Sequence, residues 1–291
     1  MPCFYPMRGY EKWSGGWTAS RREAAHDLLT GQIKELSVPC GQCIGCRLER
    51  SRQWAIRCVH EASLHQDNCF VTLTYAPEYL PADGSLNKRD FVLFMKRLRK
   101  RFGEGIRFFQ CGEYGEKFAR PHHHVCLFNF DFPDKQFLSH NLGNPIYVSK
   151  ALSELWPFGF SSIGSLTFES AAYVARYIMK KINGEMASKH YDGRQPEYIT
   201  MSRCPGIGAG WLDLYSSDCY PKDFITVKGG IKCRPPRYYD RLYRENHGPE
   251  FIEIKRRRRQ NAIANSITDD ELSRKRQHLV EITKRLKRPI H

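Results

Sequence analysis

The strongest constraint on the fold is the alternation of strand-like and helix-like patterns between residues 69 and 182. Residues 69–75 are mainly β-branched and aromatic, which predicts a buried strand. Residues 90–102 repeat apolar side chains at helical spacing, with basic residues on the opposite face. Two further strand patterns, at 106–111 and 122–130, are joined by a short polar segment and are predicted to form a hairpin.

The second half of this segment continues the alternation. It predicts a short helix at 149–155, a strand at 160–167 and a helix at 170–182. The resulting order is β-α-β-β-α-β-α, with the hairpin in its middle. This order predicts an α+β fold in which helices back an antiparallel sheet.

The chain is expected to have four parts. Residues 1–64 hold a Cys-rich segment and a helix that packs on the core, and the core itself occupies residues 65–185. Residues 186–250 are rich in Gly, Pro and Tyr and have few periodic segments, which predicts a loop-rich extension. Residues 251–291 form a basic tail.

Positive charge is concentrated in this tail. Residues 255–291 carry twelve Lys or Arg and four Asp or Glu, a formal +8 of the chain's +15. The run Lys255 to Arg259 predicts a basic linker, and Thr268 with Glu271 forms a capping-box pattern that predicts a following amphipathic helix. Such an excess favours polyanionic partners, because each neutralised phosphate releases counterions. A solvated tail without a specific target is the alternative.

The sequence also bears on the compartment. No apolar run approaches the roughly 18 residues of a membrane-spanning helix, and the first residues lack the apolar stretch of a signal peptide. Eleven cysteines, an odd number, fit reduced thiols better than a secreted disulfide framework. We therefore expect a soluble, unsecreted protein that binds no membrane.

A metal site is predicted on the hairpin. His122 and His124 alternate along a strand and so project from one face, while His123 faces away. Two imidazoles make half a metal site, and a structural histidine pair is the alternative. Glu113 on the neighbouring strand can bring a carboxylate to them, with Glu116 as the fallback ligand. This set suits Mg²⁺ or Mn²⁺, which would polarise a scissile phosphate.

Two tyrosines are candidate nucleophiles. Tyr173 and Tyr177 are four residues apart, so a helix places them on one face, and Lys180 lies on the same side. Aromatic core positions are the alternative interpretation. A phenol of pKa ~10 is mostly protonated at neutral pH and needs an activated phosphate, a nearby cation or a base to attack. The product would be a phosphotyrosine ester, which a second tyrosine could help to resolve.

A third cluster is formed by Cys40, Cys43 and Cys46, with two residues between successive cysteines. This spacing favours a thiophilic metal such as zinc in a closed structural site, which needs a fourth ligand. Three residues are candidates for that ligand: Cys3, Cys58 and His60. Reduced cysteines without metal, or an iron–sulfur cluster, are the alternatives.

Three blocks in this order resemble the motifs of the HUH superfamily of rolling-circle replication initiators. They are more closely similar to the replication-associated proteins of small single-stranded DNA bacteriophages, the microviruses of gokushovirus type. The blocks are residues 70–75, 120–125 and 173–181. Residues 40–54 and 201–208 also look like segments of the phage group. The resemblance therefore spans about residues 1–210, and the tail is similar mainly in composition.

The resemblance implies an HUH endonuclease core of RNA-recognition-motif-like or ferredoxin-like type. It implies a metal-dependent nickase and ligase in which Tyr173 or Tyr177 attacks single-stranded DNA at the replication origin, stays joined to the 5′ end and frees a 3′ hydroxyl for host polymerase. Lys180 would stabilise phosphate charge. The residues expected to contact DNA are Arg176, Lys181, Arg256, Arg257, Arg258 and Arg259. The expected setting is a bacterial host's cytoplasm, with host polymerase and helicase as partners.

Two other functions stay open from the sequence. One is an HUH transposase or relaxase with the same chemistry. The other is a non-catalytic protein that binds or packages single-stranded DNA, in which the tyrosines and histidines are structural. The chain also departs from the superfamily at His123, where the residue between the metal histidines is usually hydrophobic.

Overall fold

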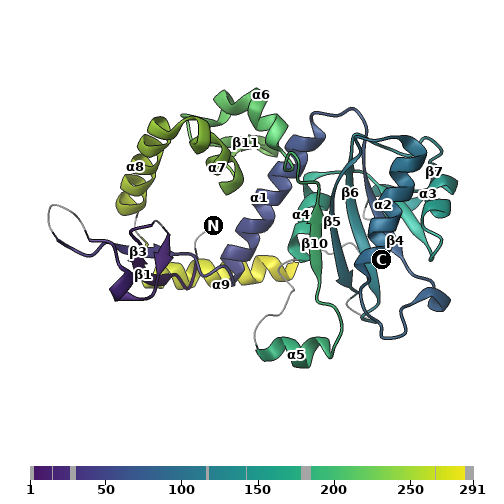
Figure 1. Ribbon diagram of the computed structural model, residues 1–291, viewed down its shortest axis with the longest axis horizontal. Coiled ribbons are helices and arrows are strands. Elements are labelled where there is room, and N and C mark those ends of the chain that lie inside the picture. The colour runs from purple at the N-terminus through teal and green to yellow at the C-terminus, as the bar shows by residue number, and fades with distance from the viewer. Residues whose placement is uncertain are drawn as a thin grey trace. The chain divides into compact units, whose positions relative to one another are not determined.

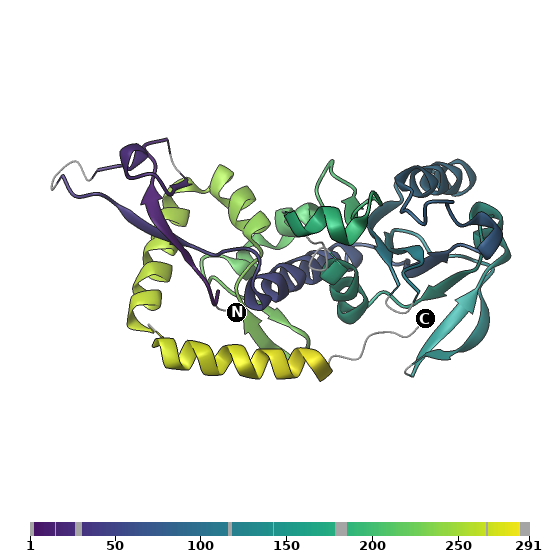
Figure 2. The same ribbon diagram turned by 90° about the horizontal axis from the view of Figure 1, so that it is seen from below.

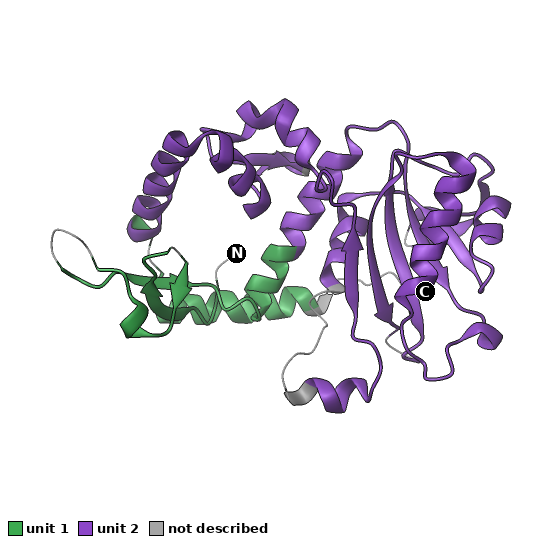
Figure 3. Ribbon diagram, viewed as in Figure 1, with its two compact units in different colours: residues 1–50, 264–288 green, residues 51–263, 289–291 purple. Residues whose placement is uncertain are grey.

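The computed structural model describes residues 3–14, 16–26, 31–115, 118–141, 143–177, 185–265 and 267–285 (Figure 1). The chain forms two compact units (Figure 3). The smaller unit contains residues 1–50 and 264–288, and residues 51–263 make up the body of the larger unit. No helix within the described ranges is both long and apolar enough to cross a membrane.

The larger unit is built on a seven-stranded antiparallel sheet with the order β10-β5-β6-β4-β9-β8-β7. Its strands are β4 (Asn68–Thr74), β5 (Arg107–Tyr114), β6 (Pro121–Phe128), β7 (Gln136–Asn141), β8 (Asn144–Val148), β9 (Ser161–Gly164) and β10 (Tyr198–Met201). β5 and β6 pair along their whole length, which confirms the predicted hairpin. The sheet and its helices confirm the α+β fold.

Helices cover both faces of this sheet (Figures 1 and 2). α2 (Lys88–Phe102) and α3 (Lys150–Leu155) pack on one face, while α4 (Phe168–Tyr177) and the later part of α1 (Ile44–Ala62) pack on the other. The first core includes Val71, Phe94, Leu98, Leu127, Leu152 and Trp156. The second core includes Ala55, Phe109, Cys126, Phe128, Ala171 and Val174. The buried apolar residues of the central strands thus divide between two separate cores, one on each face of the sheet.

The sequence analysis missed the hairpin β7–β8, which lies between β6 and α3. The strand β7 is exposed along nearly its whole length, so it has no apolar face that an alternating pattern could reveal. The hairpin extends the sheet beyond β9 through the pairing of Tyr147 with Ile163.

The expectation of a loop-rich extension at 186–250 was wrong. This segment contains α5 (Glu185–Tyr191), α6 (Ala209–Cys219), β11 (Ile225–Val227), β12 (Ile231–Cys233) and α7 (Arg237–Asn246), besides β10. A separate core of the larger unit holds it together, built from Ile56, Leu212, Tyr220, Ile225, Tyr239, Phe251 and Ile254. Because this core includes Tyr220 and Tyr239, with Tyr238 and Tyr243 packed against it, a pattern of purely apolar residues does not reveal it.

The basic run is also not a linker, because it lies within α8 (Gly248–Ala264). Phe251 and Ile254 bury one side of this helix. The following helix, α9 (Asp269–Arg285), begins as predicted at the capping box. The Thr268 backbone N–H donates to the Glu271 carboxylate and the Glu271 N–H donates to the Thr268 hydroxyl, each across 3.3 Å.

The smaller unit contains a three-stranded sheet with the order β2-β1-β3. Its strands are β1 (Met7–Glu11), β2 (Trp17–Thr18) and β3 (Glu35–Val38). The guanidinium of Arg276 on α9 lies 5.2 Å from the ring centroid of Tyr5, just before β1. Short 3₁₀ turns complete the chain at η1 (Arg21–Glu23), η2 (Pro77–Tyr79) and η3 (Lys228–Gly230).

Candidate active site

A carboxylate and two imidazoles converge where β5 pairs with β6. The register places Glu113 opposite His122, and His124 two residues further along the same face. The Nε2 atoms of His122 and His124 lie 2.7 and 3.0 Å from the same oxygen, Oε1 of Glu113. All three side chains are buried on the side of the sheet that α4 covers. The structure thus brings the three predicted ligands together.

The outer nitrogens of both imidazoles are also held. Nδ1 of His122 lies 3.0 Å from the Arg120 carbonyl oxygen, and Nδ1 of His124 lies 3.0 Å from the Thr72 hydroxyl. A carbonyl oxygen can only accept, so Nδ1 of His122 carries a proton. Nε2 of His122 therefore faces the Glu113 carboxylate as a hydrogen-bond donor when the ring is protonated, and as a free ligand atom when the ring is neutral. A carboxylate oxygen between two imidazole nitrogens attracts a cation, so the residues fit a metal ion.

The charge of Glu113 supports the same conclusion. Burial raises the pKa of Glu113, but hydrogen bonds with His122 and His124 outweigh it and lower that pKa to about 2. The carboxylate is therefore ionised at neutral pH despite its burial. One anionic oxygen donor and two imidazole nitrogens are a donor set that divalent cations accept.

Tyr173 brings its hydroxyl to this group from α4. Its Oη lies 3.4 Å from Oε1 of Glu113, and its ring meets the His124 ring edge-on at 5.0 Å between centroids. The start of α4 is set by a reciprocal pair of hydrogen bonds between Thr167 and Ser170. The hydroxyl of Ser51 on α1 donates to the Ala172 carbonyl across 2.9 Å. These contacts fix the helix that carries the phenol.

The rest of the tyrosine motif is only partly described. Tyr177 is the last described residue of α4, and its side chain lies outside the description. Lys180 and Lys181, together with the fallback ligand Glu116, lie outside the described residues. Arg176 is half-buried, with its guanidinium carbon 5.7 Å from the Tyr173 ring centroid.

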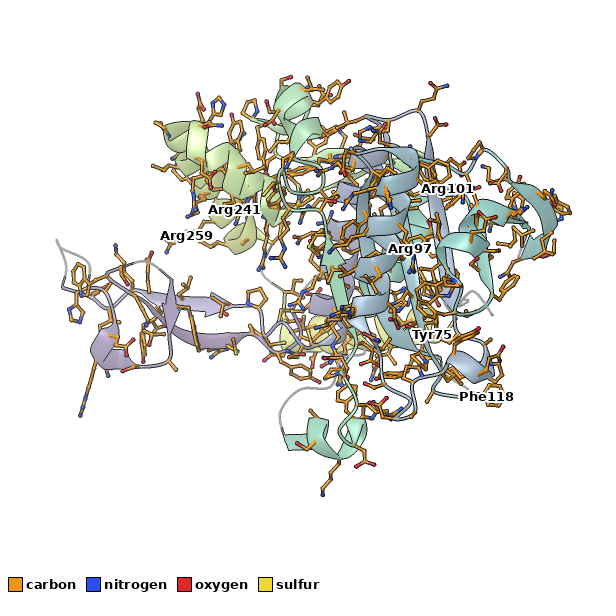
Figure 4. The ribbon with its side chains drawn as sticks, turned by 45° about the vertical axis from the view of Figure 1, so that its right-hand side comes forward. Tyr75, Arg97, Arg101, Phe118, Arg241 and Arg259 are labelled. Carbon is orange, nitrogen blue, oxygen red and sulfur yellow. The ribbon has the colours of Figure 1, made fainter. Side chains whose placement is uncertain are left out.

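His123 belongs to the opposite layer of the sheet. Its Nε2 lies 3.3 Å from the Tyr75 hydroxyl, its Nδ1 lies 3.1 Å from Nε2 of Gln110, and its side chain is fully buried (Tyr75 is labelled in Figure 4). Burial first, and then the neighbouring histidines, lower the pKa of His123 to about 3. His123 is therefore a neutral core residue, which accounts for the departure at this position.

Thr72 is a site residue that the sequence analysis did not single out. It lies on β4 directly opposite His124, and it is buried. The same alternation rule that pairs the two histidines would have found it, because Thr72 faces the α4 side while its neighbours Val71 and Leu73 join the other core.

The predicted cysteine cluster forms within the smaller unit. Cys3 joins Cys40, Cys43 and Cys46 there. The other two candidates for the fourth ligand, Cys58 and His60, belong to the larger unit. Cys58 is buried in its core, and the ring of His60 stacks on Trp211 with 3.5 Å between centroids.

The arginines of the basic run have different surroundings. Arg256 is exposed and pairs with Glu253 on its own helix. Arg258 is half-buried between Asp223 and Asp240, with its nitrogens 2.5 and 2.7 Å from their carboxylates. Arg259 of α8 is exposed. Figure 4 labels it together with Arg241 of α7.

The fold and the site define an α+β protein with a carboxylate–histidine centre beside a buried tyrosine. The family model described as replication-associated protein ORF2/G2P matches residues 68–182, a segment that contains the whole centre. The chain is 35% identical to replication-associated protein ORF2 of Spiroplasma virus 4, over 100% of this chain and 98% of that protein.

Two further relatives have the same description. Replication-associated protein VP4 of Bdellovibrio phage phiMH2K is 34% identical over 87% of this chain and 80% of its own length. Replication-associated protein ORF4 of Chlamydia phage 1 is 32% identical over 74% of this chain and 56% of its own length. No solved structure shows significant similarity. The chain therefore belongs to the family of microvirus replication-associated proteins, which associates it with phage replication.

Proposed function

We propose that this protein is a metal-dependent nickase and strand transferase that initiates rolling-circle replication of a phage genome. The observation that carries the proposal is the convergence of His122 and His124 on one carboxylate oxygen of Glu113, at 2.7 and 3.0 Å, beside the hydroxyl of Tyr173. A buried set of metal ligands with one ionised carboxylate, next to a tyrosine hydroxyl, suits phosphoryl transfer to that tyrosine. Membership in a family of replication-associated proteins supports the same function.

The three ligands would hold Mg²⁺ or Mn²⁺, and the bound ion would supply Lewis acidity to a phosphate oxygen. Tyr173, or Tyr177 four residues later, forms a bond from its phenol oxygen to the scissile phosphorus. The bond from phosphorus to the 3′ oxygen breaks. The phenol loses its proton, and the departing 3′ oxygen gains one. The 5′ end thus stays on the tyrosine, and the free 3′ hydroxyl can prime the host polymerase.

The proposed partner is single-stranded DNA. Tyr173 is only 4% exposed, and a flexible single strand can reach such a hydroxyl more easily than a duplex can. Arg176 lies next to the phenol, and Lys180 and Lys181 continue the same motif. Exposed Arg256, Arg257 and Arg259 on α8 would bind phosphates elsewhere along the strand. Host helicase and the host bacterial cytoplasm belong to this proposal.

The test is a covalent-adduct assay. Purified protein is mixed with labelled single-stranded oligonucleotides that tile the origin region of the phage genome, with Mn²⁺ or Mg²⁺, and run on a denaturing gel. We expect an adduct that EDTA prevents and that maps to Tyr173 or Tyr177. The double variant with Tyr173→Phe and Tyr177→Phe should form none, while Tyr215→Phe, at an exposed tyrosine, should react normally.

The same assay also distinguishes the proposed nickase from a non-catalytic DNA-binding protein. The burial of Tyr173 is the one observation that favours a non-catalytic DNA-binding protein with a structural tyrosine. If folded protein binds the origin strand but forms no adduct with either ion, that alternative replaces the proposal. Adduct formation by the double variant would instead move the nucleophile to another residue.

A further inference from the structure

A second group of metal-ligating atoms lies in the smaller unit, outside the candidate active site. The Sγ atoms of Cys3, Cys40, Cys43 and Cys46 all lie within 4.8 Å of one another. All four cysteines are free thiols, and all are half-buried. We propose that they bind one zinc ion in a closed structural site, which the proposed nicking chemistry does not use.

The sulfur spacing matches a tetrahedral site. Sγ of Cys3 lies 3.6 Å from Sγ of Cys40 and 3.9 Å from Sγ of Cys43. With Zn–S bonds of ~2.3 Å, the edges of a tetrahedron of four sulfurs measure about 3.8 Å. A disulfide would bring two sulfurs to ~2.05 Å. The observed distances therefore suit four thiolates around an ion.

Backbone N–H groups donate hydrogen bonds to three of the four sulfur atoms and so stabilise negative charge on them. The Cys40 N–H donates to Sγ of Cys3 across 3.3 Å, the Cys43 N–H donates to Sγ of Cys40 across 3.3 Å, and the Phe4 N–H donates to Sγ of Cys43 across 3.4 Å. Gly41 takes a φ of +75°, which lets the chain turn tightly between Cys40 and Cys43. Amide donors of this kind are the outer contacts that orient thiolate ligands.

The donor atoms distinguish this site from the candidate active site. Four soft sulfurs select zinc over Mg²⁺ or Mn²⁺, whereas the carboxylate and imidazoles of Glu113, His122 and His124 accept the harder ions. A closed set of four protein ligands leaves no position for water or substrate. We therefore assign the cysteine site a structural role.

The ion would organise the smaller unit. Cys3 and Cys40 are 37 residues apart, so one ion closes the loop that contains β1, β2 and β3. Cys46 lies in the first turn of α1, which ties that loop to the helix. Two residues after Cys3, Tyr5 contacts Arg276 of α9. Zinc would thus hold both the sheet and the contact with α9.

Metal analysis of the full-length reduced protein tests this directly. We expect one zinc per chain after dialysis against a weak chelator that removes Mn²⁺. Replacement by Co²⁺ should give the intense sulfur-to-cobalt absorption of a tetrahedral thiolate site. The Cys43→Ser variant should lose both, and Cys204→Ser, at an exposed cysteine outside the group, should keep both. Zinc absent from the wild-type protein, or an iron chromophore in its place, would overturn the assignment.

Three further measurements cover the cases in which a variant fails to fold or in which zinc binds at the other site. In wild-type protein, a mercurial thiol reagent should release one equivalent of zinc, read with a colorimetric zinc indicator. Chelation with EDTA at raised temperature should speed tryptic cleavage within 1–50 and 264–288, while 51–263 persists. The double variant His122→Ala with His124→Ala should retain its zinc, so failure of the nicking proposal leaves this one intact. Loss of zinc in that double variant would contradict the separation.

Discussion

The hydroxyl of Tyr173 lies 3.4 Å from Oε1 of Glu113, the same oxygen that faces Nε2 of both His122 and His124. One atom therefore connects β5, β6 and α4. A shift of one residue in the pairing of β5 with β6 would turn Glu113 to the other face of the sheet, where His123 is buried. The site depends on the register of two strands and on the docking of one helix.

Replacing Glu113 should weaken metal binding without unfolding the protein. Glu113→Gln keeps the side-chain size and removes the charge, so we expect Mn²⁺ affinity to fall by about 10-fold to 100-fold. Isothermal titration with Mn²⁺ measures it, and circular dichroism checks the fold. Glu104→Gln, at an exposed position, should bind as wild type. Equal affinity in the two variants would exclude Glu113 as a ligand.

Tyr173→Phe should remove the adduct at this residue without unfolding the protein. The ring stays in its core, and loss of the hydrogen bond to Glu113 costs about 1 kcal/mol. Tyr173→Ala, by contrast, leaves a cavity and should cost about 3–5 kcal/mol. Urea unfolding measures both values. A Phe variant as unstable as the Ala variant would show that the hydroxyl has a mainly structural role.

Thr72 should act by positioning His124. Thr72→Val removes the hydroxyl that faces Nδ1 of His124 at 3.0 Å, and we expect about a 10-fold loss of Mn²⁺ affinity. Thr72→Ser, which retains the hydroxyl, should restore most of that affinity. Thr226→Val, at an exposed strand position, serves as the control. A Ser variant as weak as the Val variant would point to packing instead of the hydrogen bond.

His60 should make the larger unit less stable in acid. Burial lowers the pKa of His60 to about 4, so between this value and ~6.5 the unfolded chain binds the proton that the folded chain does not. Stability contributed by neutral His60 is therefore lost as the pH falls from 7 to 5, by at most about 2 kcal/mol. Urea unfolding at both pH values should show a smaller loss for His60→Gln, and an unchanged loss for exposed His140→Gln.

Adjacent arginines of α8 should behave oppositely. Arg258→Ala breaks the contacts with Asp223 and Asp240 and should cost about 2–3 kcal/mol of stability. Arg259→Ala should leave stability unchanged, weaken single-stranded DNA binding and reduce its salt dependence. Thermal unfolding and binding titrations at two salt concentrations measure these effects. Equal loss of DNA affinity with no loss of stability in both variants would contradict the distinction.

The core of the fold could be predicted because its central strands are runs of buried residues and its helix α2 has one apolar side. The alternation of side chains along a strand also predicts which way each histidine points. Apolar patterns do not predict elements whose side chains are exposed or whose buried side chains are polar. The exposed strand β7 has no apolar face, and the core beneath α8 rests on tyrosines and on the aspartates that bind Arg258.

The partners of a side chain were harder to predict than its face. Nothing near Arg258 in the sequence shows that Asp223, 35 residues away, meets its guanidinium. The fourth ligand of the cysteine cluster presented the same difficulty, because the sequence offers Cys3, Cys58 and His60 as candidates and does not show which of them lies near Cys40. Long-range contacts of this kind depend on the tertiary fold, which local patterns do not encode.

The position of β10 has a practical consequence for anyone who shortens this chain. Residues 198–201 form the outermost strand beside β5, and Tyr198 covers Gly112, where an added Cβ would approach the ring to 2.8 Å. The family match ends at residue 182, before this strand. A fragment that ends there would leave the backbone N–H and C=O groups of β5 unpaired next to Glu113. Exposed edge strands of this kind pair with other chains and promote aggregation. The smallest fragment that resists aggregation should therefore extend past residue 201.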